Sequence, residues 1–201
     1  MSGIAIFGGA FDPFHNGHLS IVKVVIHLPF IKEMFIIPTH LPPHKKVASI
    51  IPKDRLTIIE AVVAELKDQG LYHKKIKISD LEIKRQGVSW TVDTVSEIKK
   101  KNPGKDLYLV IGSDSYFKFN TWKRYQEILG MVRLIVIRRE DFDRDCYKKF
   151  YDASLSMIPY NKFIFLDNDP VIVSSTEVRT MLAGEQSIKG LVPDSVLGFL
   201  Q

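Results

Sequence analysis

The stretch of sequence that decides the fold lies close to the N-terminus and reads Gly8-Gly9-Ala10-Phe11-Asp12-Pro13-Phe14-His15-Asn16-Gly17-His18. It follows an apolar run, residues 4–7, which predicts a buried strand, and it leads into a helical pattern over about residues 17–28 that Pro29 stops. Two glycines after a strand let the backbone approach a ligand closely, and the free N–H groups of a helix start suit an anion such as phosphate. We therefore expect a strand–turn–helix unit with an anion site at its turn.

The rest of the chain repeats this alternation of strand and helix. Apolar runs and helical spacing predict further strands at 34–37, 107–111, 134–137 and 163–166, and helices over 56–66, over 92–98 and from about Thr176. Residues 76–83 are expected to be extended, and the poorly patterned residues 140–160 to be a mobile insertion. Strands that alternate with helices imply parallel βαβ units. The expected fold class is therefore α/β, a doubly wound, Rossmann-like parallel sheet with helices on both faces, which binds its ligands at the carboxyl ends of the strands.

The composition is that of one globular domain, with 201 residues of which 45% are hydrophobic and 25% charged. We expect a single domain over residues 1–201, with a small C-terminal helical part at about 174–201. One cysteine, Cys146, rules out an internal disulfide framework and fits a reducing compartment. The N-terminus has no basic region typical of a signal peptide, and no apolar run approaches the roughly 18 residues of a membrane span. We therefore expect a cytoplasmic chain without a membrane partner.

The formal net charge of +5 comes from one part of the chain. Residues 67–105 hold 10 Lys/Arg and 5 Asp/Glu, so the remainder is neutral overall. The run of lysines at 99–101, just before Asn102-Pro103-Gly104, is typical of a helix C-terminus, where cations suit the negative end of the dipole. A nucleic-acid surface would add interleaved aromatic residues, and this part of the chain has only Tyr72 and Trp90. We therefore expect no nucleic-acid partner.

His15 and His18 are the first candidates for chemistry. Three residues apart at a helix start, they share a face and offer imidazole donors to a phosphate. The sequence contains neither GxxxxGK[ST] nor GxGxxG, so the loop is neither a P-loop nor a dinucleotide fingerprint. A metal site remains an alternative, in which Asp12 and the two histidines bind an ion and His40 or His44 completes the shell.

Two later motifs also suit anions. Pro38-Thr39-His40-Leu41-Pro42-Pro43-His44-Lys45-Lys46 predicts a stiff loop after the second strand that presents His44, Lys45 and Lys46. In Ser174-Ser175-Thr176-Glu177-Val178-Arg179, hydroxyls precede a helix and Arg179 follows one turn later, which favours a second anion site. The pair Thr176 and Arg179 does not fit a capping box, because that motif needs Glu or Gln at the second position.

Two further motifs suit a nucleoside. Gly112-Ser113-Asp114 follows a predicted strand, where a carboxylate is well placed for ribose hydroxyls. Trp122 suits stacking on a flat ring, although it and the nearby Phe117 and Phe119 fit a hydrophobic core equally well. In Trp90-Thr91, threonine is expected to be an N-cap first and a ligand residue second.

Taken together and in order, these motifs resemble the bacterial nicotinate-nucleotide adenylyltransferase family of HxGH nucleotidyltransferases. Phosphopantetheine adenylyltransferases share HxGH but are shorter and lack the Ser-Ser-Thr-x-x-Arg segment. The resemblance implies a nucleotidyltransferase-type sheet and transfer of the adenylyl group of ATP to nicotinate mononucleotide. The products would be nicotinate adenine dinucleotide (deamido-NAD) and pyrophosphate, in NAD biosynthesis, with Mg²⁺ held through the ATP phosphates. The resemblance is compatible with a homodimer and does not establish one.

The resemblance also implies a role for each matching residue. The implied catalytic residues are His15, His18, Lys45 and Arg179. The implied ATP-binding residues are Gly8, Gly9, Ala10, Phe11, Gly112, Asp114, Arg139, Ser174, Ser175 and Thr176. The implied nicotinate mononucleotide-binding residues are Thr91, Trp122, His44 and Trp90.

This sequence departs from the family at two places. Ala10 stands where Thr or Ser is commoner, and Arg138-Arg139-Glu140-Asp141 lacks the usual Arg-Pro-Gly turn. Other acceptors, nicotinamide mononucleotide or phosphopantetheine, remain alternatives. So do a metallohydrolase built on Asp12, His15 and His18, and a regulatory module that binds a nucleotide without turnover.

Overall fold

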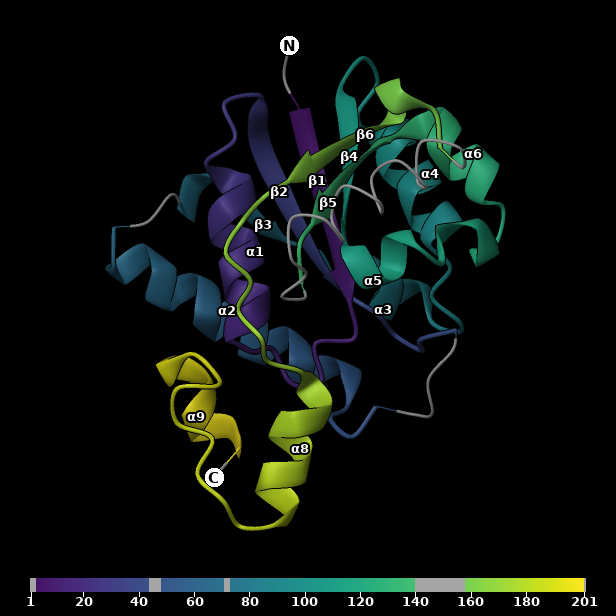
Figure 1. Ribbon diagram of the computed structural model, residues 1–201. Helices are drawn as coiled ribbons and strands as arrows, with labels where there is room; N and C mark the ends of the chain where they lie inside the picture. The colour runs from purple at the N-terminus through teal and green to yellow at the C-terminus, as the bar shows by residue number, and fades with distance from the viewer. Residues whose placement is uncertain (1–2, 44–47, 71–72, 140–157, 201) are drawn as a thin grey trace.

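The computed structural model describes residues 3–43, 48–70, 73–139 and 158–200. Its centre is a six-stranded sheet with the order β3-β2-β1-β4-β5-β6, in which every neighbouring pair is parallel (Figure 1). The strands are β1 (Gly3–Gly9), β2 (Ile31–Pro38), β3 (Ile76–Ile78), β4 (Asp106–Gly112), β5 (Arg133–Ile137) and β6 (Phe163–Leu166). The predicted doubly wound α/β sheet is thus confirmed, and its strand order reverses direction between β1 and β4.

Helices cover both faces of the sheet (Figure 1). On one face lie α1 (Asn16–Ile26), α2 (Pro52–Asp68), α8 (Ser175–Ala183) and α9 (Asp194–Leu200); on the other lie α3 (Leu81–Arg85), α4 (Thr91–Lys101), α5 (Ser113–Tyr116) and α6 (Tyr125–Met131). Short 3₁₀ turns occur at η1 (His73–Lys75), η2 (Phe119–Thr121) and η3 (Tyr160–Lys162). Each described helix falls short of the length or the apolarity that a membrane span needs.

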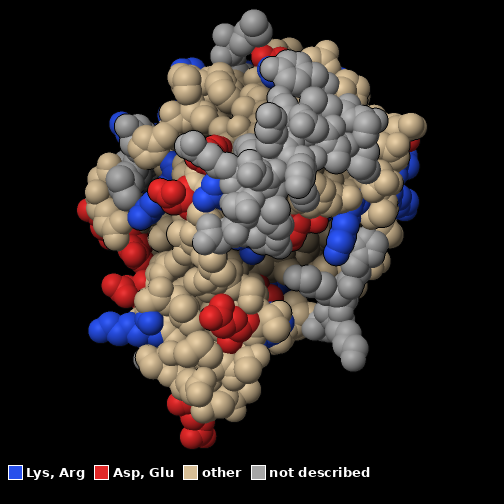
Figure 2. All heavy atoms as spheres, in the orientation of Figure 1, with Lys and Arg blue, Asp and Glu red and all other residues tan. Residues whose placement is uncertain are grey.

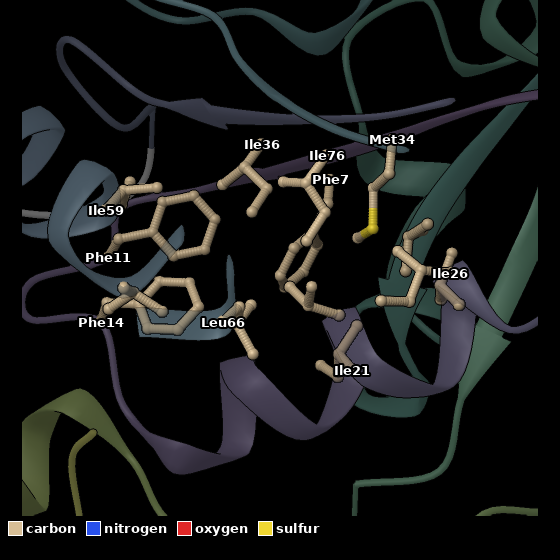
Figure 3. Close-up of a cluster of buried hydrophobic side chains, with 14 of the residues drawn as sticks. Phe7, Phe11, Phe14, Ile21, Ile26, Met34, Ile36, Ile59, Leu66 and Ile76 are labelled. Atoms are coloured by element: carbon tan, nitrogen blue, oxygen red, sulfur yellow. The ribbon is translucent and has the colours of Figure 1, made fainter. Parts of the chain in front are cut away.

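The strands are apolar on both sides because both sides are buried. In β1, Ala5 and Phe7 face the cluster under α1 and α2, whereas Ile4 and Ile6 face the cluster under α4 and α6. Figure 3 shows the first cluster, where the ring of Phe7 lies among side chains of α1, β2 and β3. Strands buried on both faces read as continuous apolar runs, which is why the sequence revealed them.

The C-terminal residues pack on the same core as the sheet. Val178 of α8 and Val196 of α9 belong to the cluster that contains Phe7, and α9 lies against α2. The expected helical part at 174–201 therefore exists, with α8 beginning at Ser175, one residue before the predicted start. Most of the predicted insertion at 140–160 lies outside the described residues.

The prediction that residues 76–83 are extended was wrong beyond Ile78. The strand β3 ends there, and α3 forms a single helical turn from Leu81 to Arg85. The apolar residues of this segment do not alternate strictly, since the spacing is broken at Ser79 and Asp80. The turn also brings Glu82 inward, where it is 5% exposed.

Several of the basic residues of 67–105 serve local structure. Lys99, Lys100 and Lys101 stand in the last turn of α4, as predicted. Lys101 pairs with Glu97, and Lys77 pairs with Glu33 of the neighbouring strand. Basic and acidic side chains are interspersed over the face of the molecule that Figure 2 shows.

Candidate active site

The turn after β1 is built around the ring of Phe11. Phe11 has a φ of 48°, in the left-handed region that a bulky residue adopts only when packing holds it there. Its ring is 1% exposed and lies edge-on to Phe7, with centroids 5.3 Å apart. Gly9 is required beneath it, because a Cβ at position 9 would lie 2.9 Å from that ring. The left-handed residue of the turn is therefore Phe11, and Gly9 gives its ring room.

His15 and His18 cap the start of α1 reciprocally. The Nδ1 of His15 accepts the backbone N–H of His18, and the Nδ1 of His18 accepts the backbone N–H of His15, both at 3.3 Å. The rings stack with centroids 3.6 Å apart, so the predicted shared face is what the structure contains. Because both Nδ1 atoms accept, each neutral ring carries its proton on Nε2. The pair thus presents two Nε2–H donors from one helix end.

A cavity of about 400 Å³ opens beside these histidines. Its walls contain seven of the residues predicted to bind ATP or act on it: His15, His18, Asp114, Arg139, Ser174, Ser175 and Thr176. They also contain Val171 and Ile172, which the sequence analysis missed and which are 42% and 68% exposed. The sequence did offer a signal for them, because this apolar pair stands just before the polar helix start at Ser174. A wall with both apolar surface and phosphate donors suits a nucleotide.

The start of α8 differs from the expectation in one respect. The helix does have a capping box, formed two residues before the pair Thr176 and Arg179: Ser174 Oγ accepts Glu177 N at 3.1 Å, and Glu177 Oε2 accepts Ser174 N at 3.4 Å. The rejected pair, Thr176 and Arg179, lies inside the helix, where the arginine donates to the threonine hydroxyl at 3.2 Å. The Ser174 hydroxyl is therefore occupied with capping, while Ser175 donates to the carbonyl of Pro13 at 3.1 Å.

Asp12 joins the loop after β1 to residues 49–50 and to α8. Its carboxylate accepts the backbone N–H groups of Ser49 and Ile50 at 2.9 and 2.8 Å. Arg179 donates to the Asp12 carbonyl at 2.6 Å and lies 3.5 Å from its carboxylate. The alternative of a metal site on Asp12, His15 and His18 finds no support among the described residues, which contain no group of three His, Cys, Asp or Glu suited to a metal ion. His44 and Lys45 lie outside the described residues.

Arg55 was missed by the sequence analysis. It is fully buried, and its guanidinium donates to the carbonyls of Ala10, Thr39, His40 and Ile50. Burial lowers the pKa of Arg55, and the charges of Asp12 and Glu82 oppose that shift. The signal was its position on α2, because residue 55 falls on the same face as the buried Ile58, Ile59, Val62 and Leu66. This arginine holds the loop after β1 to the loop after β2.

A second cavity, of about 540 Å³, lies on the other side of Asp114. It brings together Gly8 and Gly9 with three residues predicted to bind the acceptor, Trp90, Thr91 and Trp122. We expected Thr91 to be the N-cap of α4, but it is the first residue of the helix. Trp90 occupies the N-cap, without a side-chain cap hydrogen bond. The carbonyl of Trp90 accepts Asp93 N at 3.1 Å, so the helix begins one residue earlier than an N-cap at Thr91 would place it. Of the predicted core aromatics, Phe119 is fully buried.

Glu82 stands in the wall of the second cavity. Thr94 donates its hydroxyl to Glu82, and Arg85 donates to Thr94 Oγ1 at 2.7 Å. Burial raises the pKa of Glu82, while hydrogen bonds from Thr94 and Ser89 and the charge of Arg85 oppose the rise. The sequence analysis missed this residue, since a glutamate in a charged segment resembles a solvated one.

Arg139 and Asp114 face each other where the two cavities meet. Arg139 Nη1 lies 3.8 Å from Asp114 Oδ1, and its side chain passes directly over Gly112, where a Cβ would collide with both residues. Arg138 turns away and pairs with Asp167 at 2.9 Å. Asn168 holds the backbone N–H and carbonyl of Arg138 at 3.1 and 3.2 Å, so it fixes the backbone just after β5.

Comparisons with known proteins agree with this geometry. The family described as cytidylyltransferase-like matches residues 6–181. A probable nicotinate-nucleotide adenylyltransferase of Borrelia garinii is 33% identical over 98% of this chain and 91% of its own length. That of Acidithiobacillus ferrooxidans is 32% identical over 98% and 92%. The chain belongs to the cytidylyltransferase-like family, among its nicotinate-nucleotide adenylyltransferases.

Solved structures show the same fold. The nicotinic acid mononucleotide adenylyltransferase of Plasmodium falciparum, complexed with NaAD, superposes with a TM-score of 0.80 at 22% identity and covers 98% of this chain and 93% of its own. Its complex with APC superposes with a TM-score of 0.78 at 20% identity, with the same coverage. For this cytidylyltransferase-like chain, the shared fold places the two cavities at the carboxyl ends of β1 and β4, where the strand order reverses.

Proposed function

We propose that this chain is a single nucleotidyltransferase domain, residues 1–201, that transfers the adenylyl group of ATP to nicotinate mononucleotide. The products are nicotinate adenine dinucleotide and pyrophosphate, in NAD biosynthesis in the cytoplasm. The observation that carries the proposal is that two cavities meet at Asp114, one of them beside the stacked imidazoles of His15 and His18. Two nucleotides bound end to end would place their phosphates at that junction.

The reaction itself asks for alignment and charge stabilisation. A phosphate oxygen of the mononucleotide attacks the α-phosphorus of ATP, and the bond from that phosphorus to the bridging oxygen of the β-phosphate breaks. The attacking phosphate is already ionised at neutral pH, so no general base is needed. Charge builds on the α-phosphate and on the leaving pyrophosphate, and preorganised donors stabilise it. We assign this role to the Nε2–H groups of His15 and His18.

The ATP phosphates are proposed to lie between the starts of α1 and α8. Residues at both helix starts line the first cavity, namely His15 and His18 at α1 and Ser175 and Thr176 at α8, and the hydrogen bond from Ser175 to the Pro13 carbonyl holds the two segments together. The β- and γ-phosphates would be held by Ser175, Thr176, Arg179 and Lys45. Ser174 would contribute by capping α8 and so fixing the start of the helix. The backbone of residues 8–11 would line the cleft beside the adenylyl group.

Mg²⁺ is proposed to enter as part of the MgATP substrate. The first cavity is lined by the imidazoles of His15 and His18, by hydroxyls and by Arg139, which are donors to anions and poor ligands for a bare hard cation. Its two carboxylates are already engaged, because Asp114 lies 3.8 Å from Arg139 and Glu177 accepts Ser174 N in the α8 cap. The ion would therefore be held through ATP phosphate oxygens. Gly112, Asp114 and Arg139 would adjoin the adenylate ribose, since Arg139 closes over Gly112 at that point.

The second cavity is proposed to hold nicotinate mononucleotide, with Trp90 and Trp122 around the pyridine ring and Thr91 and His44 beside it. Its aromatic wall favours a flat heterocycle over the flexible arm of phosphopantetheine. The first turn of α4 offers N–H groups to an anionic ring substituent. A nucleic-acid partner is not part of the proposal, and sedimentation would test for a homodimer.

Pyrophosphate release tests the function. Purified protein with MgATP is given nicotinate mononucleotide, nicotinamide mononucleotide or phosphopantetheine in parallel, with an EDTA-treated arm. We expect turnover to be fastest with nicotinate mononucleotide and to stop in EDTA. ATP binding without release would favour a regulatory module, and stoichiometric bound zinc with hydrolysis would favour a metallohydrolase.

A further inference from the structure

Two lysines belong to the walls of the second cavity. Lys118 is the N-cap of η2, and Lys123 follows its last residues, so both come from the segment that also carries Trp122. The only two tryptophans of the chain, Trp90 and Trp122, line the same cavity. Cationic and aromatic side chains therefore meet at the end of the cavity formed by η2 and the start of α4.

Lys123 has a fixed place there. Its Nζ lies 4.5 Å from the centroid of the Trp90 ring, within the range of a cation–π contact. Trp90 is also the N-cap of α4, so the ring under the ammonium group belongs to the residue at the helix start, where the dipole is positive. Two positive influences at one point favour an anion between them.

The carboxylates of the cavity have partners of their own. Asp114 faces Arg139 at 3.8 Å, and Glu82 accepts the hydroxyl of Thr94 deep in the wall. The next residue along the chain, Arg124, pairs with Glu127. Among the described residues, the ion pairs of these acids do not involve Lys123, whose side chain lines the cavity and whose Nζ lies over the Trp90 ring.

We propose that Lys123 is a specificity-determining residue that recognises a carboxylate on the pyridine ring of the acceptor. The assignment rests on the proposed function, in which the ring lies beside Trp90. A pyridinium ring carries a positive charge, so an ammonium group beside it is unfavourable unless the ring also bears an anion. Lys123 therefore favours nicotinate mononucleotide and disfavours its amide, combining attraction for one with repulsion of the other.

The phosphate of the acceptor is the competing partner for this lysine. Both mononucleotides carry the same phosphate, and only nicotinate mononucleotide carries the carboxylate. A lysine that binds the phosphate would change both affinities equally, whereas one that binds the carboxylate would change their ratio. Comparing the two mononucleotides separates these readings.

The test is Lys123→Met, which removes the charge and keeps an unbranched apolar chain over Trp90. Binding is followed by the fluorescence of Trp90 and Trp122, and turnover by pyrophosphate release. We expect the preference for nicotinate over nicotinamide mononucleotide, as a ratio of kcat/KM, to fall about tenfold, the effect of one charge-assisted hydrogen bond. The change should appear in KM and Kd for nicotinate mononucleotide, with kcat within about threefold of wild type. Lys123→Arg should keep the preference.

Two matched variants complete the design. Lys100→Met removes the same charge from an exposed position at the other end of α4 and should leave the ratio unchanged. Lys118→Met, in the same cavity, should weaken both mononucleotides alike. Equal losses for both mononucleotides in Lys123→Met, or a ratio matching Lys100→Met, would overturn the assignment. A wild type that neither binds nor turns over either mononucleotide would instead overturn the proposed function.

Discussion

The imidazole rings of His15 and His18 stack 3.6 Å apart, while each Nδ1 accepts the backbone N–H of the other residue. These two hydrogen bonds form a capping box at the start of α1. It fixes the orientation of both rings and leaves the protons of the neutral rings on Nε2. The same two hydrogen bonds that begin α1 therefore prepare the donors that the reaction needs.

Replacing His18 separates these two roles. His18→Ala removes one donor and half of the capping box, so we expect kcat to fall by about 10²–10³ and stability to fall by about 1 kcal/mol. His18→Gln can restore the reciprocal cap, because Gln is favoured at this position, and should recover stability without recovering kcat. Thermal unfolding and pyrophosphate release measure the two effects. Near-normal turnover in His18→Ala would contradict the catalytic assignment.

Arg55 should be essential for the loops that meet beneath the site. Arg55→Met fills much of the space but leaves the carbonyls of Ala10, Thr39 and Ile50 without their donor. Each buried carbonyl that loses its partner costs about 1–3 kcal/mol, so we expect unfolding in urea to show a loss of at least about 3 kcal/mol. Arg133→Met, at an exposed position of β5, is the control and should stay within about 0.5 kcal/mol of wild type. A loss in Arg55→Met no larger than in the control would show that the hydrogen bonds contribute little.

Glu82 makes stability depend on pH. Because burial raises its pKa in the folded state, the folded protein holds this proton more tightly than the unfolded chain. Its contribution is complete below the ordinary glutamate pKa and is lost as pH rises through the raised value. Glu82→Gln keeps an acceptor for Thr94 and cannot ionise, so it should gain stability relative to wild type between pH 5 and pH 8. Glu60→Gln, at an exposed position of α2, should show no such trend. The measurement is the urea midpoint of each protein at pH 5 and pH 8. The same change in midpoint with pH for wild type and Glu82→Gln would refute the prediction.

The sheet could be predicted because its strands are buried on both faces. Runs such as Leu107 to Ile111 need no knowledge of their neighbours to be recognised, and their alternation with helices indicates parallel strands joined by right-handed crossovers. The motif residues could be placed for the same reason. His15, Asp114 and Ser175 each stand at the end of a predicted strand or the start of a predicted helix, where the sheet brings them together.

The rest depends on partners far along the chain. Arg55 is 45 residues from Ala10, and no local pattern tells a buried arginine from an exposed one. Glu82 turns inward because Thr94, 12 residues later, offers it a hydroxyl. The register of the α8 cap was missed because Ser174, Ser175 and Thr176 are all suitable caps, and tertiary contacts decide among them.

Gly112 should control how Arg139 meets ATP. In Gly112→Ala the new Cβ would collide with the Arg139 side chain and the Asp114 carboxylate, both of which are flexible enough to move aside. We therefore expect a protein that folds normally but whose KM for ATP rises about tenfold, as for one lost charge-assisted contact. Gly130→Ala, in α6, meets nothing within 4 Å and should keep the wild-type KM while gaining up to about 1 kcal/mol from helix propensity. Unfolding curves measured beside the kinetics separate the two effects. An unchanged KM in a folded Gly112→Ala would mean that Arg139 does not contact the nucleotide from this position, since the substitution moves that side chain and leaves the histidine pair untouched.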